Sequence, residues 1–212
     1  MSKEVNLQFV RPFGPIICKV TMPIEIVNSL NEYVDNIITD KNKSKELDHG
    51  AKLAGNVQQE LKLDKDFIES SNWGNFLSSC VNLWLKKSLN KKITKFEIIS
   101  TWVVRQFQND YNPIHTHGGH ISGVGYLKVP KNLGEYTQKT KKNNHNGELT
   151  LIHGSKMFLS ESTFNIVPKV GEFYFFPNYL MHSVYPFSNS NEERRSVSFN
   201  AHIDEKIYNI YT

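Results

Sequence analysis

The sequence predicts an α+β fold that is mainly β, in which N-terminal helices support a double-stranded β-helix, or jelly roll. Apolar residues recur at helical spacing in the first 90 residues, whereas from Ile93 onward they alternate in short runs bounded by turn residues. Helices followed by a series of short strands are typical of an α+β chain built on antiparallel sheets. We expect one domain over residues 1–212, with helical support at about 22–90 and the jelly-roll core at about 93–212.

Two amphipathic helices are expected before the strands. Pro23 suits a first helical turn, and apolar residues follow it at Val27, Leu30, Val34 and Ile37. Asn72 can cap the second helix. The side chains on one face of that helix should pack against a sheet: Trp73, Phe76, Leu77, Cys80 and Trp84.

The strands are predicted from alternation and from turn residues between the runs. In the long strand after Ile93, Trp102 and Val104 should share a face with Phe96 and Ile98. Residues Lys131–Asn146 form a long polar loop, which is typical of a lid or a mobile segment. The shorter strands are expected at Val5–Val10, Ile16–Val20, Val124–Val129, Glu148–Ile152, Thr163–Val167, Glu172–Phe176, Ser183–Tyr185, Ser196–Ile203 and Lys206–Tyr211.

Composition limits the class of protein. The formal charge is only +4 and the lysines are dispersed, so nucleic-acid binding is not favoured. Cys18 and Cys80 have no metal-ligand spacing and fit free thiols in a reducing compartment. The sequence has no continuous apolar run long enough to span a membrane and no apolar leader, so we expect a cytoplasmic protein without a membrane partner.

Histidines gather in the stretch N-P-I-H-T-H-G-G-H, between two strand-like runs. His115 and His117 are two residues apart, so on an extended chain their side chains point to the same side. His182 follows an aromatic strand and can supply a third imidazole, a common ligand of iron, zinc, copper and nickel. A single histidine near a strand end is usually structural. The combination instead predicts a facial metal site with open positions for a substrate or co-substrate.

Two arginines open the last core strand and fall on opposite faces of it. Arg194 alternates with Ser196 and Ser198, whereas Arg195 alternates with Val197 and Phe199. A guanidinium matches a carboxylate bidentately, so the arginine on the inner face is a candidate anion ligand.

These motifs resemble those of the 2-oxoglutarate- and Fe(II)-dependent oxygenases, within them a group of bacterial and phage-encoded members. The resemblance covers about the C-terminal half of the chain. It rests on H-x-H, S-G-V-x-Y-L, P-x-x-G-x-x-x-x-F-P-x-x-x-x-H and R-x-S-x-S-F-N, in that order. The matching residues are His115, His117, Ser122, Gly123, Val124, Tyr126, Leu127, Pro168, Gly171, Phe176, Pro177, His182, Arg194, Ser196, Ser198, Phe199 and Asn200.

The sequence departs from the superfamily at one ligand position. The usual set is H-x-D with a distal histidine, two imidazoles and one carboxylate, whereas position 117 here is histidine. Three neutral imidazoles leave the charge of Fe(II) at +2, which the dianion of 2-oxoglutarate can neutralise. The substitution therefore does not exclude co-substrate binding.

The resemblance implies a role for each candidate residue. His115, His117 and His182 would bind Fe(2+). Arg194 with Ser196 and Tyr126 would bind 2-oxoglutarate, with Arg194 preferred over Arg195 because it gives the R-x-S spacing. The implied reaction uses O2, releases succinate and CO2, and hydroxylates a substrate. Alternates or supporting residues are His120, Arg195, Arg105, Ser198 and Asn200.

Two other interpretations stay open. One is a cupin-like three-histidine metal dioxygenase that needs no ketoacid, and the other is a non-catalytic jelly-roll binding module. The substrate, a small molecule or a protein side chain, is not encoded in a readable motif. Its determinants should lie in loops such as His49–Leu63, expected as a loop or short helix near the mouth of the site, and Lys131–Asn146. Oligomeric state is likewise open.

Overall fold

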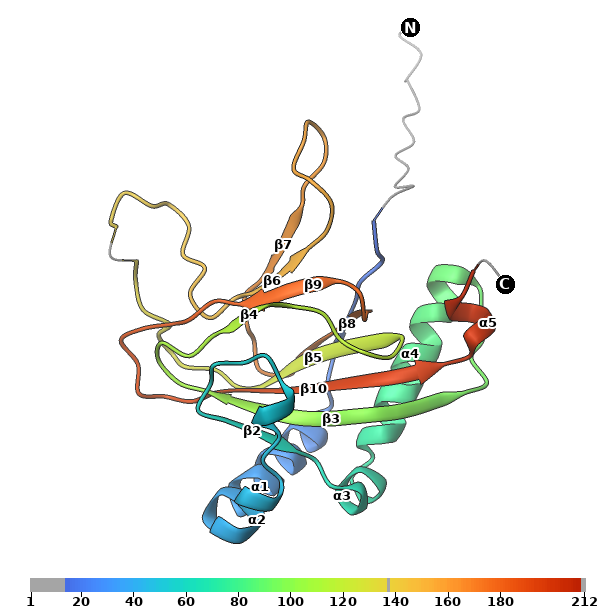
Figure 1. Ribbon diagram of the computed structural model, residues 1–212, viewed down its shortest axis with the longest axis horizontal. Coiled ribbons are helices and arrows are strands. Elements are labelled where there is room, and N and C mark those ends of the chain that lie inside the picture. Colours follow the sequence, from blue (N-terminus) through green and yellow to red (C-terminus); the bar gives the residue numbers. More distant parts are fainter. Residues whose placement is uncertain (1–13, 137, 211–212) are drawn as a thin grey trace, which may run out of the picture.

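Two antiparallel sheets lie face to face, and a layer of helices covers the outer face of the larger one (Figure 1). The computed structural model describes residues 14–136 and 138–210. Strand order is β1-β8-β5-β10-β3-β2 in the larger sheet and β4-β9-β6-β7 in the smaller one. The strands are β1 Cys18–Thr21, β2 Gln59–Lys62, β3 Phe96–Gln106, β4 Asn112–His115, β5 Ile121–Lys128, β6 Leu149–Ile152, β7 Thr163–Ile166, β8 Glu172–Pro177, β9 Met181–Val184 and β10 Arg194–Ile203.

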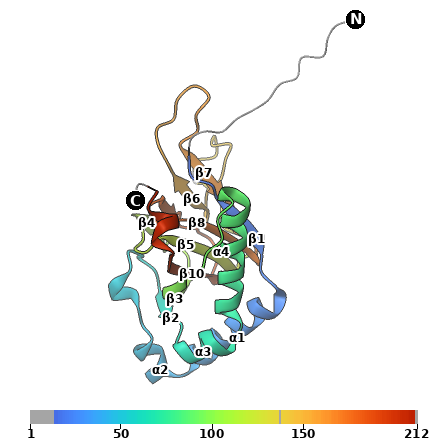
Figure 2. The same ribbon diagram turned by 90° about the vertical axis from the view of Figure 1, so that its right-hand side faces the viewer.

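Both predicted helices are present and pack on the larger sheet (Figure 2). They are α1, Ile24–Thr39, and α4, Trp73–Leu89; the buried side chains follow the apolar pattern of the sequence. Asn72 does stand at the N-cap of α4, but its φ is 58° and its side chain makes no capping hydrogen bond to the backbone. The remaining helices are α2 Lys41–Glu46, the 3-10 turn η1 Gly50–Lys52, α3 Lys65–Ser70 and α5 Glu205–Tyr208.

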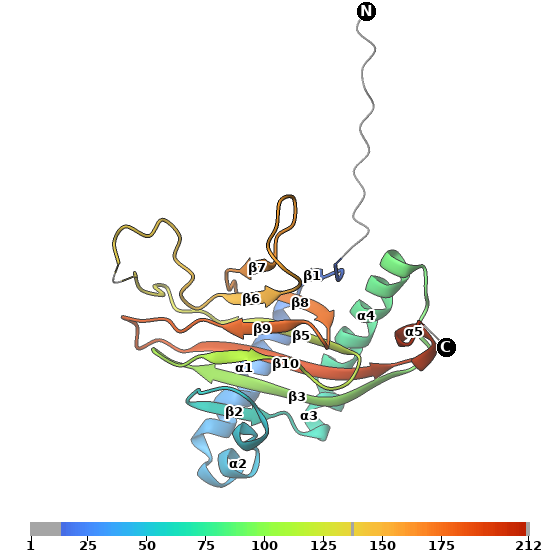
Figure 3. The same ribbon diagram turned by 45° about the horizontal axis from the view of Figure 1, so that its top comes forward.

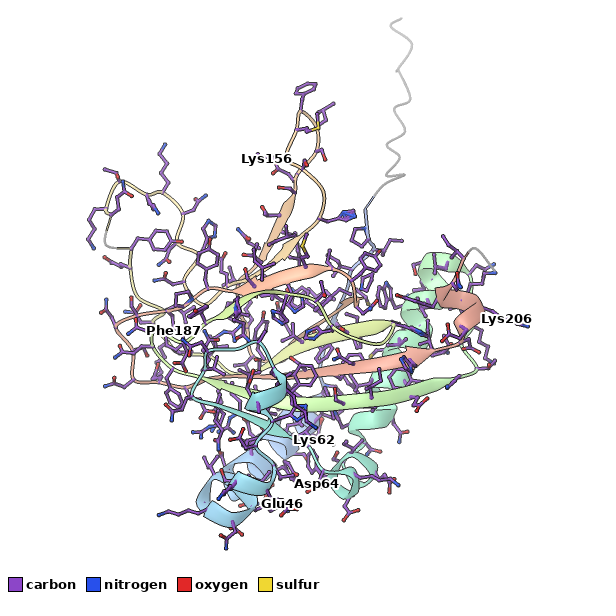
Figure 4. All side chains as sticks on the ribbon, viewed as in Figure 1. Glu46, Lys62, Asp64, Lys156, Phe187 and Lys206 are labelled. Atoms are coloured by element: carbon purple, nitrogen blue, oxygen red, sulfur yellow. The ribbon has the colours of Figure 1, made fainter. Side chains whose placement is uncertain are left out.

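The two faces of the larger sheet serve different layers, as alternation requires. One face joins α1 and α4 in the main core, with Phe173, Phe175, Val197 and Phe199 among its buried residues. The other face meets the smaller sheet (Figure 3). The side chains between the two sheets form a second core that includes Tyr126. Beyond this layer the β6–β7 hairpin projects outward, with Lys156 near its end (Figure 4).

The predicted shared face of β3 is wrong, because a β-bulge interrupts the alternation of this strand. The pairing of β3 with β10 shifts register between Asn200 and Ala201, which leaves Ile99 as the extra residue on β3. Phe96 and Ile98 consequently pack with the helices, whereas Trp102 and Val104 face the smaller sheet and line a cavity. A strict two-residue period cannot reveal this change, because the bulge is set by the partner strand.

Other predictions of local structure differ from the fold. The strand expected at Lys206–Tyr211 is wrong, because residues 205–208 form α5 after the chain turns at Asp204; Tyr211 is outside the described residues. The segment His49–Leu63 contains η1, as expected of a short helix, but also the unexpected strand β2. The strand predicted at Val5–Val10 lies outside the described part of the chain. Within that part, every helix is too short or too polar to cross a lipid bilayer.

Candidate metal centre and its cavity

Three histidines from two distant parts of the chain converge between the sheets. His115 on β4 and His182 on β9 are register partners across the smaller sheet. His117 lies two residues beyond β4, where its N–H donates to Asn178 O at 3.0 Å and its carbonyl accepts from Asn178 Nδ2 at 3.2 Å. One ring nitrogen from each histidine lies within 4.8 Å of the other two.

Backbone carbonyls fix the tautomers of two of these rings. His115 Nδ1 lies 2.7 Å from Pro113 O, and His182 Nδ1 lies 2.8 Å from Leu180 O. A carbonyl only accepts, so each Nδ1 carries the proton and each Nε2 keeps a lone pair. Such hydrogen bonds orient ligating histidines in metal sites and raise their basicity.

The spacing of the ring nitrogens fits a metal ion. His117 Nε2 and His182 Nε2 are 3.1 Å apart. Two imidazole nitrogens that bind one ion at about 2.1 Å and at right angles lie about 3.0 Å apart. Because His182 Nε2 bears a lone pair, this contact requires a proton or a cation between the two nitrogens. Three neutral nitrogens on one side of an ion also match the donor chemistry of non-heme iron.

Burial keeps two of the imidazoles neutral. Desolvation first, and then the neighbouring histidines, lower the pKa of His117 to about 3. Desolvation followed by His115 lowers the pKa of His182 to about 4. Both rings therefore hold free lone pairs at neutral pH, which is the state that a metal ion needs.

The three rings form one wall of a cavity of about 180 Å³ between the two sheets. The opposite wall is the larger sheet, from which Trp102, Ser198 and Arg194 face the cavity. Trp102 also packs edge-on against His117, with ring centroids 5.5 Å apart. Lys52, Leu53 and Ala54 line the same cavity, so the segment His49–Leu63 does border the site.

Arg194 reaches the cavity as a buried cation that has no carboxylate partner in the part of the chain that the structure describes. Its side chain is 1% exposed, Nε donates to Gly147 O at 3.1 Å, and Nη1 donates to Gln106 Oε1 at 3.0 Å. Nη2 is buried and has no hydrogen-bond partner within the described structure. Burial lowers the pKa of this guanidinium. An unpaired buried charge is costly, so this group is set to receive an anion.

Tyr126 and Ser196 stand beside Arg194. The Arg194 guanidinium lies 5.1 Å from the centroid of the Tyr126 ring. Tyr126 is fully buried, and its hydroxyl has no partner with good hydrogen-bond geometry among the described residues. Burial raises its pKa to about 12, although the nearby Arg194 guanidinium acts to lower that pKa. Ser196 is the register partner of Tyr126 and lines the cavity, as does Ser198. These residues supply neutral donors next to an unpaired cation.

The remaining predicted residues lie away from the cavity wall. His120 stacks on Tyr208 at 4.0 Å and is only 7% exposed, so it is neither solvent-exposed nor among the residues that face the metal site. Arg105 donates to Glu193 at 2.9 Å and to Gln59 at 2.8 Å. Asn200 accepts from Ser122 Oγ at 2.8 Å.

Arg195 is also buried, on the helical side of β10. It pairs with Glu193 at 2.7 Å and with Asp35 at 2.7 Å, and donates to Asn31. Glu193 lies two residues before Arg195 in the chain, whereas Asp35 belongs to α1.

The sequence interpretation missed three polar residues at or near the cavity: Glu60, Asn112 and Gln106. Glu60 and Asn112 line the cavity, and Gln106 holds Arg194. Asn112 stands directly before Pro113 in the histidine stretch, so its position was a readable signal. Glu60 gave none, because it depends on the unpredicted strand β2.

Comparisons with known proteins agree with this geometry. Residues 100–200 match the family model described as "Putative 2OG-Fe(II) oxygenase", where 2OG is 2-oxoglutarate. No curated protein matches the chain in sequence.

Solved structures similar to this chain share its fold. A prolyl-4-hydroxylase from Pseudomonas putida has a TM-score of 0.56 at 13% identity, covering 87% of this chain and 91% of its own. A viral collagen prolyl hydroxylase from Paramecium Bursaria Chlorella virus-1, in complex with 2-oxoglutarate, has a TM-score of 0.51 at 17% identity, covering 87% and 94%. The alpha-ketoglutarate-dependent epimerase SnoN from nogalamycin biosynthesis has a TM-score of 0.57 at 14% identity, covering 86% and 76%.

Proposed function

We propose that the chain is a 2-oxoglutarate- and Fe(II)-dependent oxygenase, which hydroxylates a bound substrate with O2 and releases succinate and CO2 from 2-oxoglutarate; the family match over residues 100–200 and the shared fold support this proposal. One observation carries this proposal. Three imidazoles face the same cavity as a buried guanidinium that has no carboxylate partner among the described residues.

The proposed scaffold is a double-stranded β-helix within a single domain, residues 1–212. Its support is the path of the chain, which alternates between the sheets. β3, β5, β8 and β10 belong to the larger sheet, whereas β4, β6, β7 and β9 belong to the smaller one. The helices share one continuous core with the larger sheet, which supports a common domain.

In this proposal His115, His117 and His182 would hold Fe(II), with His115 and His182 offering Nε2. Bound iron with 2-oxoglutarate supplies the activation of O2 and the oxidation of a C–H bond. The three histidines fix the position of the ion, since backbone carbonyls and Asn178 hold their rings and backbone in place. Phe176 and Trp102 pack against His182 and His117 and limit the access of water to the ion.

Arg194 and Tyr126 would bind the far carboxylate of 2-oxoglutarate. A carboxylate at Arg194 Nη2 would satisfy the donor that the described residues leave without a partner, and the Tyr126 hydroxyl could donate to the same anion. Ser196 lies beside Tyr126 in register and would add a hydroxyl donor. Three neutral imidazoles would leave the ion at +2, of which the C1 carboxylate of 2-oxoglutarate would offset one charge, while the far carboxylate would pair with Arg194.

A ketoacid-dependent reaction explains the site better than a cupin-like dioxygenase. Three histidines alone suit either class. The buried Arg194 guanidinium in the same cavity lowers the free energy of unfolding. A reaction that uses no dicarboxylate gives no reason to keep such a group.

The direct test is co-substrate turnover. The purified chain, supplied with Fe(II), 2-oxoglutarate and ¹⁸O2, should form succinate and CO2 in equal amounts, with ¹⁸O in the new succinate carboxylate. His115→Ala should abolish succinate formation, whereas His153→Ala, which alters an exposed histidine, should not. Equal succinate formation by the chain and by His115→Ala would show that the histidine site is not responsible.

A further inference from the structure

Glu60 is an acidic side chain in the wall of the same cavity. β2 is the edge strand of the larger sheet and pairs with β3, and Glu60 stands opposite Val104, which in turn stands opposite Ser196. Ser196 is itself opposite Tyr126 on β5. Directly paired residues share a face of the sheet, so these side chains form one row across four strands. At about 4.8 Å between strands, Glu60 lies about 14 Å along the sheet from Tyr126.

The Glu60 carboxyl is buried without a partner. The residue is 2% exposed, and Oε1 is fully buried with no hydrogen-bond partner in the described structure. Gly55 passes directly over it, since a Cβ on this glycine would lie 2.7 Å from Glu60 Oε1 and 2.8 Å from Asn112 Nδ2. Any larger residue at position 55 would displace one of these two groups. The loop thus covers Oε1, and Glu60 is one of the residues that line the cavity.

The cavity is therefore electrically polarised. Tyr126 ends the row, with the Arg194 guanidinium 5.1 Å from its ring centroid, and Glu60 stands at the other end. Arg194 Nη2 and Glu60 Oε1 both lack a hydrogen-bond partner among the described residues. We propose that Glu60 selects the substrate by pairing with an ammonium or guanidinium group on it, at the side of the cavity away from Arg194. This assignment rests on the proposed function and adds a substrate class to it.

Several features favour a cationic partner over a neutral one. A hydrogen bond between two charged groups is stronger than a neutral one and offsets more of the cost of a buried carboxylate. The nearby walls include Leu53, Val104 and Trp102, which suit the methylene groups of an alkyl ammonium or guanidinium chain. A lysine or arginine side chain of a peptide and a small free amine share this chemistry.

The charges around Glu60 agree with this assignment. Burial first, and then the carboxylate of Asp48, raise the pKa of Glu60 to about 7. A bound cation would favour the ionised form again. Lys52 lines the same cavity but is exposed and makes no ion pair with Glu60 among the described residues. Its ammonium is the competing occupant that the experiment must exclude.

The test is a binding measurement that needs no turnover. The full chain, with and without Zn(II) and 2-oxoglutarate, would be titrated at pH 8 by NMR with n-pentylammonium, the isosteric alcohol and pentanoate. Nα-acetyl-lysine amide and a short lysine-containing peptide would be titrated in a second series. Comparing their affinities with that of n-pentylammonium shows whether the site prefers a small free amine or a lysine side chain of a peptide. Glu46→Gln is the matched control for Glu60→Gln, since it removes a carboxylate from the exposed end of α2 (Figure 4).

The chain should bind one of the cations with a dissociation constant on the order of 1 mM or lower, and the alcohol and pentanoate at least 10-fold more weakly. Glu60→Gln should weaken cation binding at least 10-fold, and Glu46→Gln should leave it unchanged. Lys52→Met should strengthen binding or leave it unchanged. A thermal midpoint for each variant shows that it is folded.

The assignment is overturned if none of the cations binds, if the alcohol binds as tightly, or if Glu60→Gln binds the cation as well as the unaltered chain. Loss of cation binding in Lys52→Met would also overturn it, by showing that another group in this wall holds the ligand. Failure of the oxygenase proposal is seen separately, as absence of succinate, and it would leave these binding results readable.

Discussion

Arg194 and Arg195 are adjacent, and both guanidinium groups are buried, yet they have opposite surroundings. Arg195 faces the helices and meets Glu193 and Asp35. Arg194 faces the cavity, where its hydrogen bonds go to a carbonyl and an amide and one of its nitrogens has no partner in the described structure. The two sides of one strand thus hold a completed ion-pair network and an incomplete one.

This difference identifies the functional face of the sheet. Buried polar groups in folded proteins are normally hydrogen-bonded, so an exception needs an explanation. Arg194 Nη2, Tyr126 Oη and Glu60 Oε1 are three such exceptions, and the residues that carry them belong to adjoining rows on the cavity side of the larger sheet. Ligands with matching charge would complete them.

The largest expected effect is on co-substrate binding. Arg194→Met should weaken 2-oxoglutarate binding at least 100-fold, equivalent to about 3 kcal/mol, because the carboxylate would lose a desolvated ionic partner. The free energy of unfolding should change little, since an unpaired buried charge is removed together with two hydrogen bonds. Calorimetric titration of the Zn(II)-loaded chain checks this. Unchanged affinity would contradict the role of Arg194.

Arg195→Met should give the reverse pattern. It leaves the mostly buried Glu193 and the half-exposed Asp35 with fewer partners, so the free energy of unfolding should fall by about 3 kcal/mol. Urea unfolding measures the loss. The affinity for 2-oxoglutarate should stay within about twofold of the unaltered chain, since Arg195 lies on the other face. A large loss of affinity for 2-oxoglutarate with an unchanged free energy of unfolding would show that Arg195, not Arg194, is the co-substrate ligand.

Glu60→Gln should stabilise the chain in a pH-dependent way. The folded pKa of about 7 exceeds the ordinary value of 4.5, so ionisation of Glu60 costs folded-state stability as pH rises through this window. The gain should be about 2 kcal/mol above pH 8 and small below pH 5, because the buried amide also lacks partners. Urea unfolding at pH 5 and pH 8 decides the matter. Equal gains at both values would show that the carboxyl is not desolvated.

Tyr126→Phe should have the smallest effect. Loss of one hydroxyl donor should weaken 2-oxoglutarate binding about fivefold, or about 1 kcal/mol, while stability stays the same or rises slightly. The calorimetric titration used for Arg194→Met applies here too. An effect as large as that of Arg194→Met would show that the tyrosine, rather than the arginine, is the main anion ligand.

Local periodicity predicted the two long helices and most strands, because the apolar residues that recur in these segments are the ones that the structure buries. It failed where the structure depends on a distant partner. β2 is a strand because it pairs with β3, the bulge at Ile99 is set by β10, and α5 follows a turn that alternation does not reveal.

In the candidate site, too, the sequence showed what depends on local pattern and hid what depends on a distant strand. The spacing of His115 and His117, the aromatic run before His182 and the alternation from Arg194 were all visible in the sequence, and the structure brings the three histidines together. Arg194 and Arg195 separate to opposite faces as predicted. Glu60 could not be found, since its place beside Val104 exists only once β2 joins the sheet.

The most direct measurement is an anaerobic titration of the Fe(II)-loaded chain with 2-oxoglutarate, followed by visible absorption. A weak charge-transfer band should appear at one equivalent if, as proposed, the ketoacid binds iron at the histidine site and Arg194 holds its far carboxylate. The band should be absent in His182→Ala and should need far more 2-oxoglutarate in Arg194→Met. Absence of a band in the unaltered chain, or the same band in all three proteins, would contradict this account.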